Sequence, residues 1–418
     1  MLIGIDDTDS RRGMCTTYLA SVLKKTLQKE LNEKVNLRLV RLNPAIPFKT
    51  RGNASICICL RDSHDVVAVV REHIEQFAHL DDLNTHPGAV FFYKNVVPPE
   101  IQSFARDAMH AVVSLSRATR LIETHGLDYL SFKTGRGLIG ALAAIGATVD
   151  EDFTYELIAY RLKSNFSKER YVNAQSVRQA DLATYPHTWD TVDRKNKAIV
   201  CVPHSPDPIL YGIRGDDPHQ ILAAHSKIIS EPVACLTLYQ TNQGTDAHIR
   251  RAKITELEEG QSYVVTGIII TEPFTIAGGH TFLQVRDDGG CLLCAAFEPT
   301  KQFRSQVRKL RYGDTVTVQG SYVENCLHLE KLWVIELSDQ HEISNPICCG
   351  KHMKSLGLMK GFKCVKCKAV ERTRHGYKIF TKREAEVGAY EVVPSARRHL
   401  AAPLIRKRSQ GQTIFPSR

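Results

Sequence analysis

A run of short alternating segments between residues 261 and 338 constrains the fold of this chain more than any other feature of its sequence. Apolar and polar residues alternate in these segments, glycine-rich turns separate them, and a helix-like stretch from Gln302 to Leu310 interrupts them. The predicted strands cover residues 263–267, 281–285, 291–297, 314–320 and 327–337. Strands with one helix between the third and the fourth are typical of the OB-fold, a barrel that binds oligonucleotides, although another small β-barrel fits the same pattern.

The 418 residues of the chain exceed what one hydrophobic core supports, so we expect several domains. The N-terminal half has an α/β pattern: a buried strand at residues 2–5, an acidic turn, and then apolar residues at helical spacing between Met14 and Lys34. Further strands are predicted at residues 35–42, 55–60, 89–93 and 233–239, with two more between 197 and 213. Further helices are predicted at residues 65–78, after residue 97, at 153–161 following the acidic start Asp150-Glu151-Asp152, and at 219–229.

The charge balance of the chain is basic. Lysine and arginine number 55 against 45 aspartates and glutamates, which gives a net charge of +10, and the excess is concentrated between Lys351 and the C-terminus. Such an excess favours a polyanionic partner, of which nucleic acid is the commonest. No apolar run approaches the roughly 18 residues of a membrane span, and the N-terminus begins at once with a strand. We therefore expect a cytoplasmic protein without membrane association.

Three aspartates, Asp6, Asp7 and Asp9, crowd the end of the first strand. Carboxylates this close repel one another unless a cation lies among them, and a hard ion such as Mg²⁺ takes oxygen ligands of this kind. The helix that follows begins with small and hydroxyl-bearing residues, Gly13, Cys15, Thr16 and Thr17. Because unpaired N–H groups at a helix start bind phosphate, the two features together predict a site for a nucleotide and its metal ion. The alternative is that these side chains only cap the helix.

A second glycine-rich stretch, Phe132 to Gly140, carries two basic residues. Its loop residues Lys133, Gly135, Arg136 and Gly137 are candidates for cradling phosphate, with the lysine and the arginine neutralising charge. The stretch matches neither a P-loop nor a dinucleotide-binding pattern. The alternative is that its small residues permit close packing of a helix.

Twelve cysteines in a chain without a secretion signal argue against a disulfide framework. Cys364 and Cys367 have the spacing of half a zinc site. The other half lies about 15 residues upstream, where Cys348 and Cys349 are adjacent and His352 follows. Two ligand sets are therefore open: the four cysteines, joined by a tight turn, or a set in which Cys349 and His352 supply the upstream half.

A series of motifs follows one order along nearly the whole chain. They are Gly4-Ile-Asp-Asp-Thr-Asp-Ser10, Gly13-Met-Cys-Thr-Thr17, Gly135-Arg-Gly137, Thr154-Tyr-Glu-Leu-Ile-Ala-Tyr-Arg161, Thr241-Asn-Gln-Gly-Thr-Asp-Ala-His248, Asn345-Pro346, Gly350-Lys351, Met353-Lys-Ser355 and Pro394-Ser-Ala-Arg-Arg-His-Leu400. Together they resemble the motifs of the archaeal tRNA-isoleucine 2-agmatinylcytidine synthetases. The resemblance implies a multidomain α+β enzyme with four modules: a kinase-like α/β module at residues 1–195, a ferredoxin-like module at 196–258, an OB-fold at 259–340, and a zinc ribbon with a basic tail at 341–418. Part of 61–120 is assigned alternatively to the ferredoxin-like module.

The resemblance also implies a reaction. Members of the family use ATP to activate carbon 2 of the wobble cytidine in the isoleucine tRNA with a CAU anticodon; agmatine then displaces the activated oxygen, and AMP and phosphate are released. By this resemblance Asp6, Asp7 and Asp9 would hold Mg-ATP, and Thr16 matches a threonine that becomes phosphorylated. Agmatine carries a guanidinium, which favours carboxylates, and Asp152 is a candidate for that contact. The family's ribbon usually has C-P-x-C where this chain has Cys348-Cys349, so the zinc ligands stay open.

Two other functions compete with this interpretation. A non-catalytic tRNA-binding protein would need only the barrel, the ribbon and the basic tail. The three aspartates of the first loop argue against it, because carboxylates oppose RNA binding. Another ATP-dependent RNA enzyme, such as a ligase or a kinase, is the second alternative, and the absence of a Walker loop and of a lysine-nucleophile motif from the sequence argues against it.

Overall fold

A nine-stranded sheet organises the N-terminal 241 residues in the computed structural model, which describes all of residues 1–418 except 48, 51, 148–151, 358, 374–376 and 408–412. The strand order is β5-β4-β1-β3-β2-β11-β6-β10-β7. The strands are β1 (Leu2–Asp6), β2 (Asn36–Arg41), β3 (Ala54–Cys59), β4 (Gly88–Phe92), β5 (Asp128–Ser131), β6 (Thr154–Arg161), β7 (Thr188–Trp189), β10 (Ile209–Gly215) and β11 (Val233–Thr241). Only β2 and β11 pair in parallel among these described strands, and this pair joins an N-terminal half to a second half.

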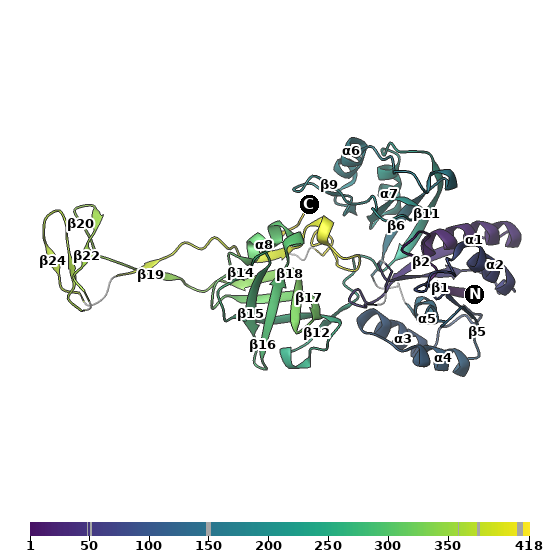
Figure 1. The fold of residues 1–418 in the computed structure, drawn as a ribbon, viewed down its shortest axis with the longest axis horizontal. Helices are drawn as coiled ribbons and strands as arrows, with labels where there is room; N and C mark the ends of the chain where they lie inside the picture. The colour runs from purple at the N-terminus through teal and green to yellow at the C-terminus, as the bar shows by residue number, and fades with distance from the viewer. Residues whose placement is uncertain (48, 51, 148–151, 358, 374–376, 408–412) are drawn as a thin grey trace.

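Helices cover both faces of the N-terminal half (Figure 1). On one face α1 (Thr16–Leu31) and α2 (Val67–Phe77) pack against apolar side chains of β1 and β3. On the other face lie α3 (Pro99–His110), α4 (Leu115–Thr124) and α5 (Leu138–Gly146). The second half has its own core, to which α6 (Ala174–Thr184) and α7 (Pro218–His225) contribute.

One predicted helix is wrong. Residues 153–161 were expected to be helical, but Thr154–Arg161 form β6, and the helix of this region, α5, lies upstream in the stretch rich in glycine and alanine. The reason is tertiary: β6 lies between β10 and β11, and nearly all of its residues are buried, so apolar residues occupy both faces without alternation. Asp150 and Glu151 of the expected acidic start lie outside the described residues.

Close packing of α5 on β1 shapes the end of that strand. A Cβ atom on Gly4 would lie 1.9 Å from the carbonyl oxygen of Ala141, and one on Gly140 would lie 1.8 Å from Oδ2 of Asp6. Only glycine allows such an approach at either position. The helix therefore lies directly against the acidic end of β1.

The predicted barrel is a closed ring of strands. They are β13 (Gln261–Ile269), β15 (Thr281–Arg286), β16 (Cys291–Ala296), β17 (Thr315–Val323) and β18 (Cys326–Glu336), with α8 (Gln302–Val307) between β16 and β17. β13 pairs with β15 and β17, β15 with β16, β16 with β18, and β18 with β17, so the ring closes. The five predicted strands and the position of the predicted helix are confirmed. Strand β26 (Gly388–Glu391) pairs with β18 on the outside, and β27 (Ile414–Phe415) pairs with β26.

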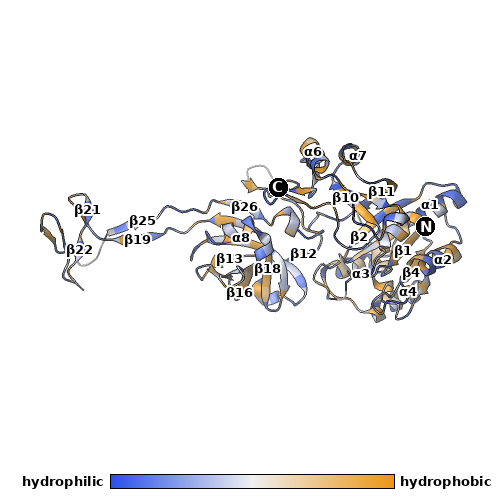
Figure 2. Ribbon diagram, turned by 45° about the horizontal axis from the view of Figure 1, so that its top comes forward, coloured by the Kyte–Doolittle hydropathy of each residue, from blue (hydrophilic) through white to orange (hydrophobic). Residues whose placement is uncertain are grey.

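Beyond the barrel, β19 (His341–Ser344) and β25 (Tyr377–Phe380) form a two-stranded arm. At its end short strands make a small ribbon: β20 (Ile347–Cys348), β21 (Lys351–His352), β22 (Lys354–Ser355), β23 (Phe362–Lys363) and β24 (Val370–Glu371). Figures 1 and 2 show from two directions that this ribbon stands away from the barrel and the sheet.

The C-terminal segment returns from the arm and braces the barrel against the sheet. The Arg397 guanidinium forms ion pairs with Asp190 of the sheet half and, at 2.9 Å, with Glu391 of β26. The carbonyl of His399 accepts a hydrogen bond from the N–H of Gly244 at 2.8 Å. Within the described part of the chain, none of the helices is both long and apolar enough to cross a lipid bilayer.

Candidate functional site

A cavity of about 540 Å³ lies between the acidic loop and the second half of the sheet. The residues from the N-terminal half that line it include Asp6, Asp7, Asp9, Cys15, Thr16, Thr17, Arg136 and Gly140. The structure therefore brings together the three predicted aspartates, the start of α1 and one basic residue of the second glycine-rich stretch.

Asp6 ends β1 and is fully enclosed. Burial, followed by the nearby carboxylates of Asp7 and Asp9, raises the pKa of Asp6 well above its ordinary range, and the positive charge of Arg136 offsets this only in part. The close approach of α5 at Gly140 leaves this side chain little freedom. A carboxylate held in this way needs further positive charge, and a cation with oxygen ligands would supply it.

Asp7 adopts left-handed backbone (φ 58°) and has a partner that the sequence did not indicate. Arg136 Nε donates to Asp7 Oδ2 at 2.9 Å, and Arg136 Nη2 lies 2.8 Å from the same oxygen. Burial outweighs this ion pair and raises the pKa of Asp7 to about 6. Arg136 thus belongs to the acidic loop, where a phosphate arriving at the cavity would meet its guanidinium.

The first turn of α1 presents backbone N–H groups beside these carboxylates. Cys15 caps the helix with extended backbone and no side-chain cap hydrogen bond. The hydroxyl of Thr16 accepts a hydrogen bond from the Thr8 hydroxyl at 3.1 Å, and the carbonyl of Thr17 accepts one from the Tyr239 hydroxyl at 2.7 Å. A helix start that lines a cavity in this way binds phosphate.

The remaining predicted phosphate-binding residues hold loops in place. Gly13 closes a tight turn by exchanging backbone hydrogen bonds with Ser10 at 3.1 and 3.2 Å. Lys133 donates to the carbonyl of Asp82. Gly135 has φ +70°, and a Cβ atom on Gly137 would lie 2.4 Å from the backbone nitrogen of Gly88. Among the described residues that line the cavity, none of these four predicted residues appears.

The opposite wall carries buried charges that the sequence did not reveal. Glu156 of β6 accepts a hydrogen bond from Arg214 of β10 at 3.1 Å and lies 3.9 Å from the guanidinium of Arg41. His399 lies nearby, and burial, together with Arg41 and Arg214, lowers its pKa well below the ordinary value. Asp190 and Asp207 also line the cavity. The available signal was Glu156 itself, a single charge inside the apolar run that was taken for a helix.

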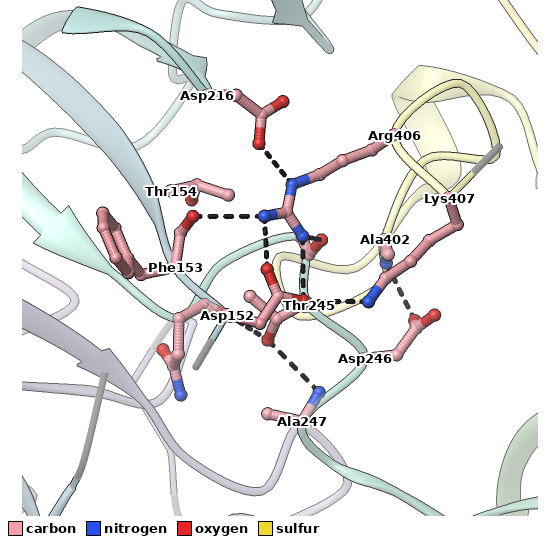
Figure 3. Close-up of polar contacts among 12 residues, drawn as sticks. Asp152, Phe153, Thr154, Asp216, Thr245, Asp246, Ala247, Ala402, Arg406 and Lys407 are labelled. Carbon is pink, nitrogen blue, oxygen red and sulfur yellow. Dashed lines mark hydrogen bonds and ion pairs between the residues drawn. The ribbon is translucent and has the colours of Figure 1, made fainter. Parts of the chain in front are cut away.

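Asp152 lies apart from this cavity, in a cradle that holds the guanidinium of Arg406 (Figure 3). Arg406 Nε donates to Asp216, Nη1 donates to Asp152 at 3.1 Å and to the carbonyl of Gly244 at 3.0 Å, and Nη2 donates to Asp152 and to the carbonyl of Phe153 at 3.1 Å. All five N–H groups of the guanidinium are therefore satisfied. Lys407 adds a second cation, at 2.8 Å from Asp152.

The ribbon gathers four sulfur atoms. The Sγ atoms of Cys348, Cys349, Cys364 and Cys367 all lie within 4.8 Å of one another, and those of Cys348 and Cys367 are 3.4 Å apart. Sulfur atoms on one tetrahedral zinc ion lie about 3.8 Å apart when each bond is about 2.3 Å, so the donor set fits Zn²⁺. Left-handed backbone at Cys349 (φ 53°) makes the turn that lets adjacent cysteines converge. The His352 ring instead contacts the carbonyl of Asn345, with Nδ1 at 3.1 Å.

Three family models match the chain. They are the TiaS TCKD domain over residues 2–64, the TiaS FLD domain over residues 135–248, and the TiaS C-terminal zinc ribbon domain over residues 345–384. The matched spans include the acidic loop, most of the opposite wall and the four clustered cysteines.

Full-length relatives carry the name 2-agmatinylcytidine synthetase TiaS, specific for isoleucine-2 tRNA. The one from Methanosarcina acetivorans is 47% identical over 432 residues, with 100% of both chains covered, and the one from Archaeoglobus fulgidus is 44% identical over 421 residues, with 99% of both covered. Among solved structures, a complex of TiaS with isoleucine-2 tRNA and ATP matches with a TM-score of 0.92 at 43% identity, covering 99% of both chains. A complex of TiaS with the same tRNA, AMPCPP and agmatine matches with a TM-score of 0.89 at 41% identity and the same coverage.

Proposed function

The chain belongs to the TiaS family of tRNA 2-agmatinylcytidine synthetases, and from this membership we propose how its own residues carry out the family's reaction. The protein is an enzyme that uses ATP to attach agmatine to carbon 2 of the wobble cytidine of isoleucine-2 tRNA, the isoleucine tRNA with a CAU anticodon. The acidic, enclosed cavity between the two halves of the sheet is the observation that carries the assignment of the site. A protein that only binds tRNA has no use for carboxylates buried in this manner.

ATP is proposed to bind with its phosphates between the acidic loop and the first turn of α1. Asp6 and Asp9 are the proposed ligands of Mg²⁺, with Asp7 held by Arg136 beside them. Magnesium bridges phosphate oxygens and neutralises the charge that develops during phosphoryl transfer. The N–H groups at the start of α1 and the guanidinium of Arg136 would hold the phosphates in line.

The chemistry requires a leaving group at carbon 2. The cytosine oxygen leaves poorly, and a phosphoryl group from ATP bonded to it makes it a good leaving group. The primary amine of agmatine then attacks carbon 2, the C–O bond breaks, phosphate leaves, and the amine loses a proton. AMP and phosphate are the products derived from ATP. The neutral imidazole of His399, on the cavity wall, is placed to accept that proton.

Four modules are proposed to divide the work. The sheet comprises a kinase-like and a ferredoxin-like module, and the match of the FLD domain model to residues 135–248 supports starting the second near residue 135 in place of 196. The closed ring of β13–β18 is proposed to be an OB-fold at residues 259–340, which would bind the tRNA. The zinc ribbon, within residues 341–418, is proposed to hold Zn²⁺ through the four clustered cysteines and not through His352. We place the enzyme in the cytoplasm, with its tRNA.

Mass analysis of the anticodon nucleoside tests the function. After incubation with ATP, Mg²⁺, agmatine and the isoleucine tRNA with a CAU anticodon, the wobble cytidine should gain the mass of agmatine less one water. AMP should appear in proportion to modified tRNA. An unmodified nucleoside, or ADP in place of AMP, would contradict the assignment.

Thr16 is expected to carry a phosphate after incubation with ATP and Mg²⁺. Its hydroxyl lines the cavity at the first position of α1, where free N–H groups stabilise a phosphoryl group. Peptide mass spectrometry should place the phosphate on Thr16, and Thr16→Val should abolish it. Thr17→Val is the matched control and should keep it. A phosphate on Thr17 alone, or on neither threonine, would reject this role.

The guanidinium of agmatine is proposed to use the cradle around Asp152. That cradle already recognises a guanidinium through two carboxylates and two carbonyls, and Arg406 occupies it. Asp216 ends the cradle two residues beyond Arg214, which lines the cavity, so about 7 Å of strand separates the two places. The four-carbon chain of agmatine can bridge this span once Arg406 has moved away.

Arg406→Ala is therefore expected to lower the KM for agmatine several-fold, because the side chain that competes for the cradle is lost. Asp152→Asn should raise that KM, and neither change should alter the KM for ATP. Lys407→Ala is the matched control, since Lys407 contacts Asp152 without filling the cradle. An unchanged or higher agmatine KM in Arg406→Ala would show that the cradle only fastens the C-terminal segment.

A further inference from the structure

A buried glutamate lies at the end of the sheet opposite the acidic loop. Glu33 follows Asn32, whose left-handed backbone (φ 50°) ends α1. The side chain of Glu33 is only 8% exposed, and neither carboxylate oxygen accepts a hydrogen bond from any residue that the structure describes. Burying a carboxylate without a donor or a counter-ion is costly, so a compensating charge is required.

Two further side chains of ligand type face Glu33 from the loop after β3. The antiparallel pairing of β2 with β3 places Asn36 opposite Cys59, so the segment before β2 and the loop after β3 lie side by side. From that loop His64 Nε2 lies 3.7 Å from Glu33 Oε2. Asp62 contributes an oxygen, and the three ligand atoms all lie within 4.8 Å of one another.

A direct contact between His64 and Glu33 does not account for this geometry. Their separation of 3.7 Å exceeds the length of a hydrogen bond, and His64 Nε2 is buried without a hydrogen-bond partner in the described part of the chain. Two ligands of one tetrahedral ion lie about 3.3 Å apart when each bond is about 2.0 Å. The separation is therefore closer to that of two ligands sharing an ion than to that of a donor and its acceptor.

We propose that Glu33, Asp62 and His64 form a binding site for a divalent transition-metal ion. One imidazole nitrogen with two carboxylates suits Zn²⁺ or Mn²⁺, whereas Mg²⁺ prefers oxygen ligands alone. Asp62 is exposed and His64 is partly exposed, so the ion can enter from solvent and keep a water ligand.

The ion would clamp the C-terminal end of α1 to the loop between β3 and α2. Because α1 has 16 residues and each rises about 1.5 Å, the site lies about 24 Å from Thr16 at the other end of the helix. It is therefore separate from the acidic cavity, and its effect falls on stability and not on the chemistry of the reaction.

The zinc content of the full-length protein tests the site. After saturation with Zn²⁺ and removal of free ion by gel filtration, the wild type should hold about two equivalents, one in the ribbon and one at Glu33. Glu33→Gln and His64→Asn should each hold about one. The double variant Cys364→Ser/Cys367→Ser should also hold about one, which distinguishes the two sites. Glu30→Gln, at an exposed position near the end of α1, is the matched control and should hold two.

Thermal unfolding supplies a second readout. Added Zn²⁺ should raise the Tm of Cys364→Ser/Cys367→Ser and should leave it unchanged once Glu33→Gln is added. If the double cysteine variant holds no zinc and its Tm does not respond, the contact between Glu33 and His64 is an ion pair only and the proposal is wrong. Circular dichroism identifies any variant that fails to fold, and His64→Asn then decides in place of Glu33→Gln.

Discussion

Asp6→Asn is expected to reduce ATP-dependent modification of the tRNA by more than about 100-fold while making the ligand-free protein more stable. Burial, and then the neighbouring Asp7, raise the pKa of Asp6 well above its ordinary range, so the fold holds this carboxylate where its charge is disfavoured. An amide of the same shape avoids that cost, but it is a poor ligand for a hard divalent ion. Loss of a partner behind a metal ligand costs about 10- to 100-fold, and loss of a ligand should exceed that range.

The raised pKa also fixes the direction of the pH dependence. A carboxyl group whose pKa is raised by folding binds its proton more tightly in the folded chain, so its contribution to the free energy of unfolding falls as the pH rises toward the folded pKa. For Asp7, which burial raises to a pKa of about 6, the window runs from about pH 4 to about pH 6. For Asp6 the loss of stability with rising pH begins at the same lower limit. Asp6→Asn should therefore flatten the fall of Tm with rising pH.

Calorimetry of the ligand-free protein across this range, combined with AMP formation at saturating tRNA, checks both parts of the prediction. Asp81→Asn is the control, because Asp81 lies on the surface in an ion pair with Arg12 and does not line the cavity. Unchanged AMP formation in Asp6→Asn would remove this carboxylate from the ATP site. A lower Tm for the ligand-free variant would show that Asp6 has a structural partner.

Local patterns in the sequence were sufficient for the barrel and for the acidic half of the site. Alternation with glycine-rich turns locates β13 to β18 because one face of each strand is buried and the other is not. The crowding of Asp6 to Asp9 before a helix is equally local, since one short stretch contains both the carboxylates and the phosphate-binding turn. The structure adds Arg136 to this group through an ion pair with a residue 129 positions away.

The other half of the site depends on contacts that no local pattern encodes. β6 lacks alternation because neighbours cover both of its faces, and this is why a strand was taken for a helix and Glu156 was missed. The pairing of β11 with β2 rests on two residue pairs that are distant in sequence, Gln240 with Arg38 and Thr241 with Leu39. His399 reaches the same cavity from the C-terminal signature, whose function the motif alone does not indicate.

Gly140→Ala is expected to fold normally and yet lose about 10- to 100-fold in ATP-dependent modification. The added Cβ atom would lie 1.8 Å from Oδ2 of Asp6, so the side chain of Asp6 must rotate away. A rotating side chain relieves the clash at little cost in stability, and alanine in a helix interior is favoured over glycine by about 1 kcal/mol. The folded protein therefore persists, but its metal-binding carboxylate is displaced.

Gly146→Ala supplies the matched control, because it adds the same methyl group to the same helix. Its Cβ atom would lie 2.2 Å from the carbonyl oxygen of Ile101, a backbone atom of α3 that cannot rotate away. This variant should lose about 1 to 3 kcal/mol of stability and keep the affinity of its folded fraction for ATP. Tm and the KM for ATP, measured on both variants, should therefore move in opposite patterns.

The double variant Asp6→Asn/Gly140→Ala connects the loss of activity to a single atom pair. If Gly140 matters only because it leaves room for the carboxylate of Asp6, then adding Gly140→Ala to Asp6→Asn should cost little further activity, and the two effects should be strongly non-additive. Gly146→Ala combined with Asp6→Asn should be additive, since neither of the atoms that it disturbs lies at the acidic loop. Additive losses for the first pair would mean that the methyl group acts by moving α5 as a whole, and the close approach of Gly140 to Asp6 would then be packing and not a device for placing the metal-binding carboxylate.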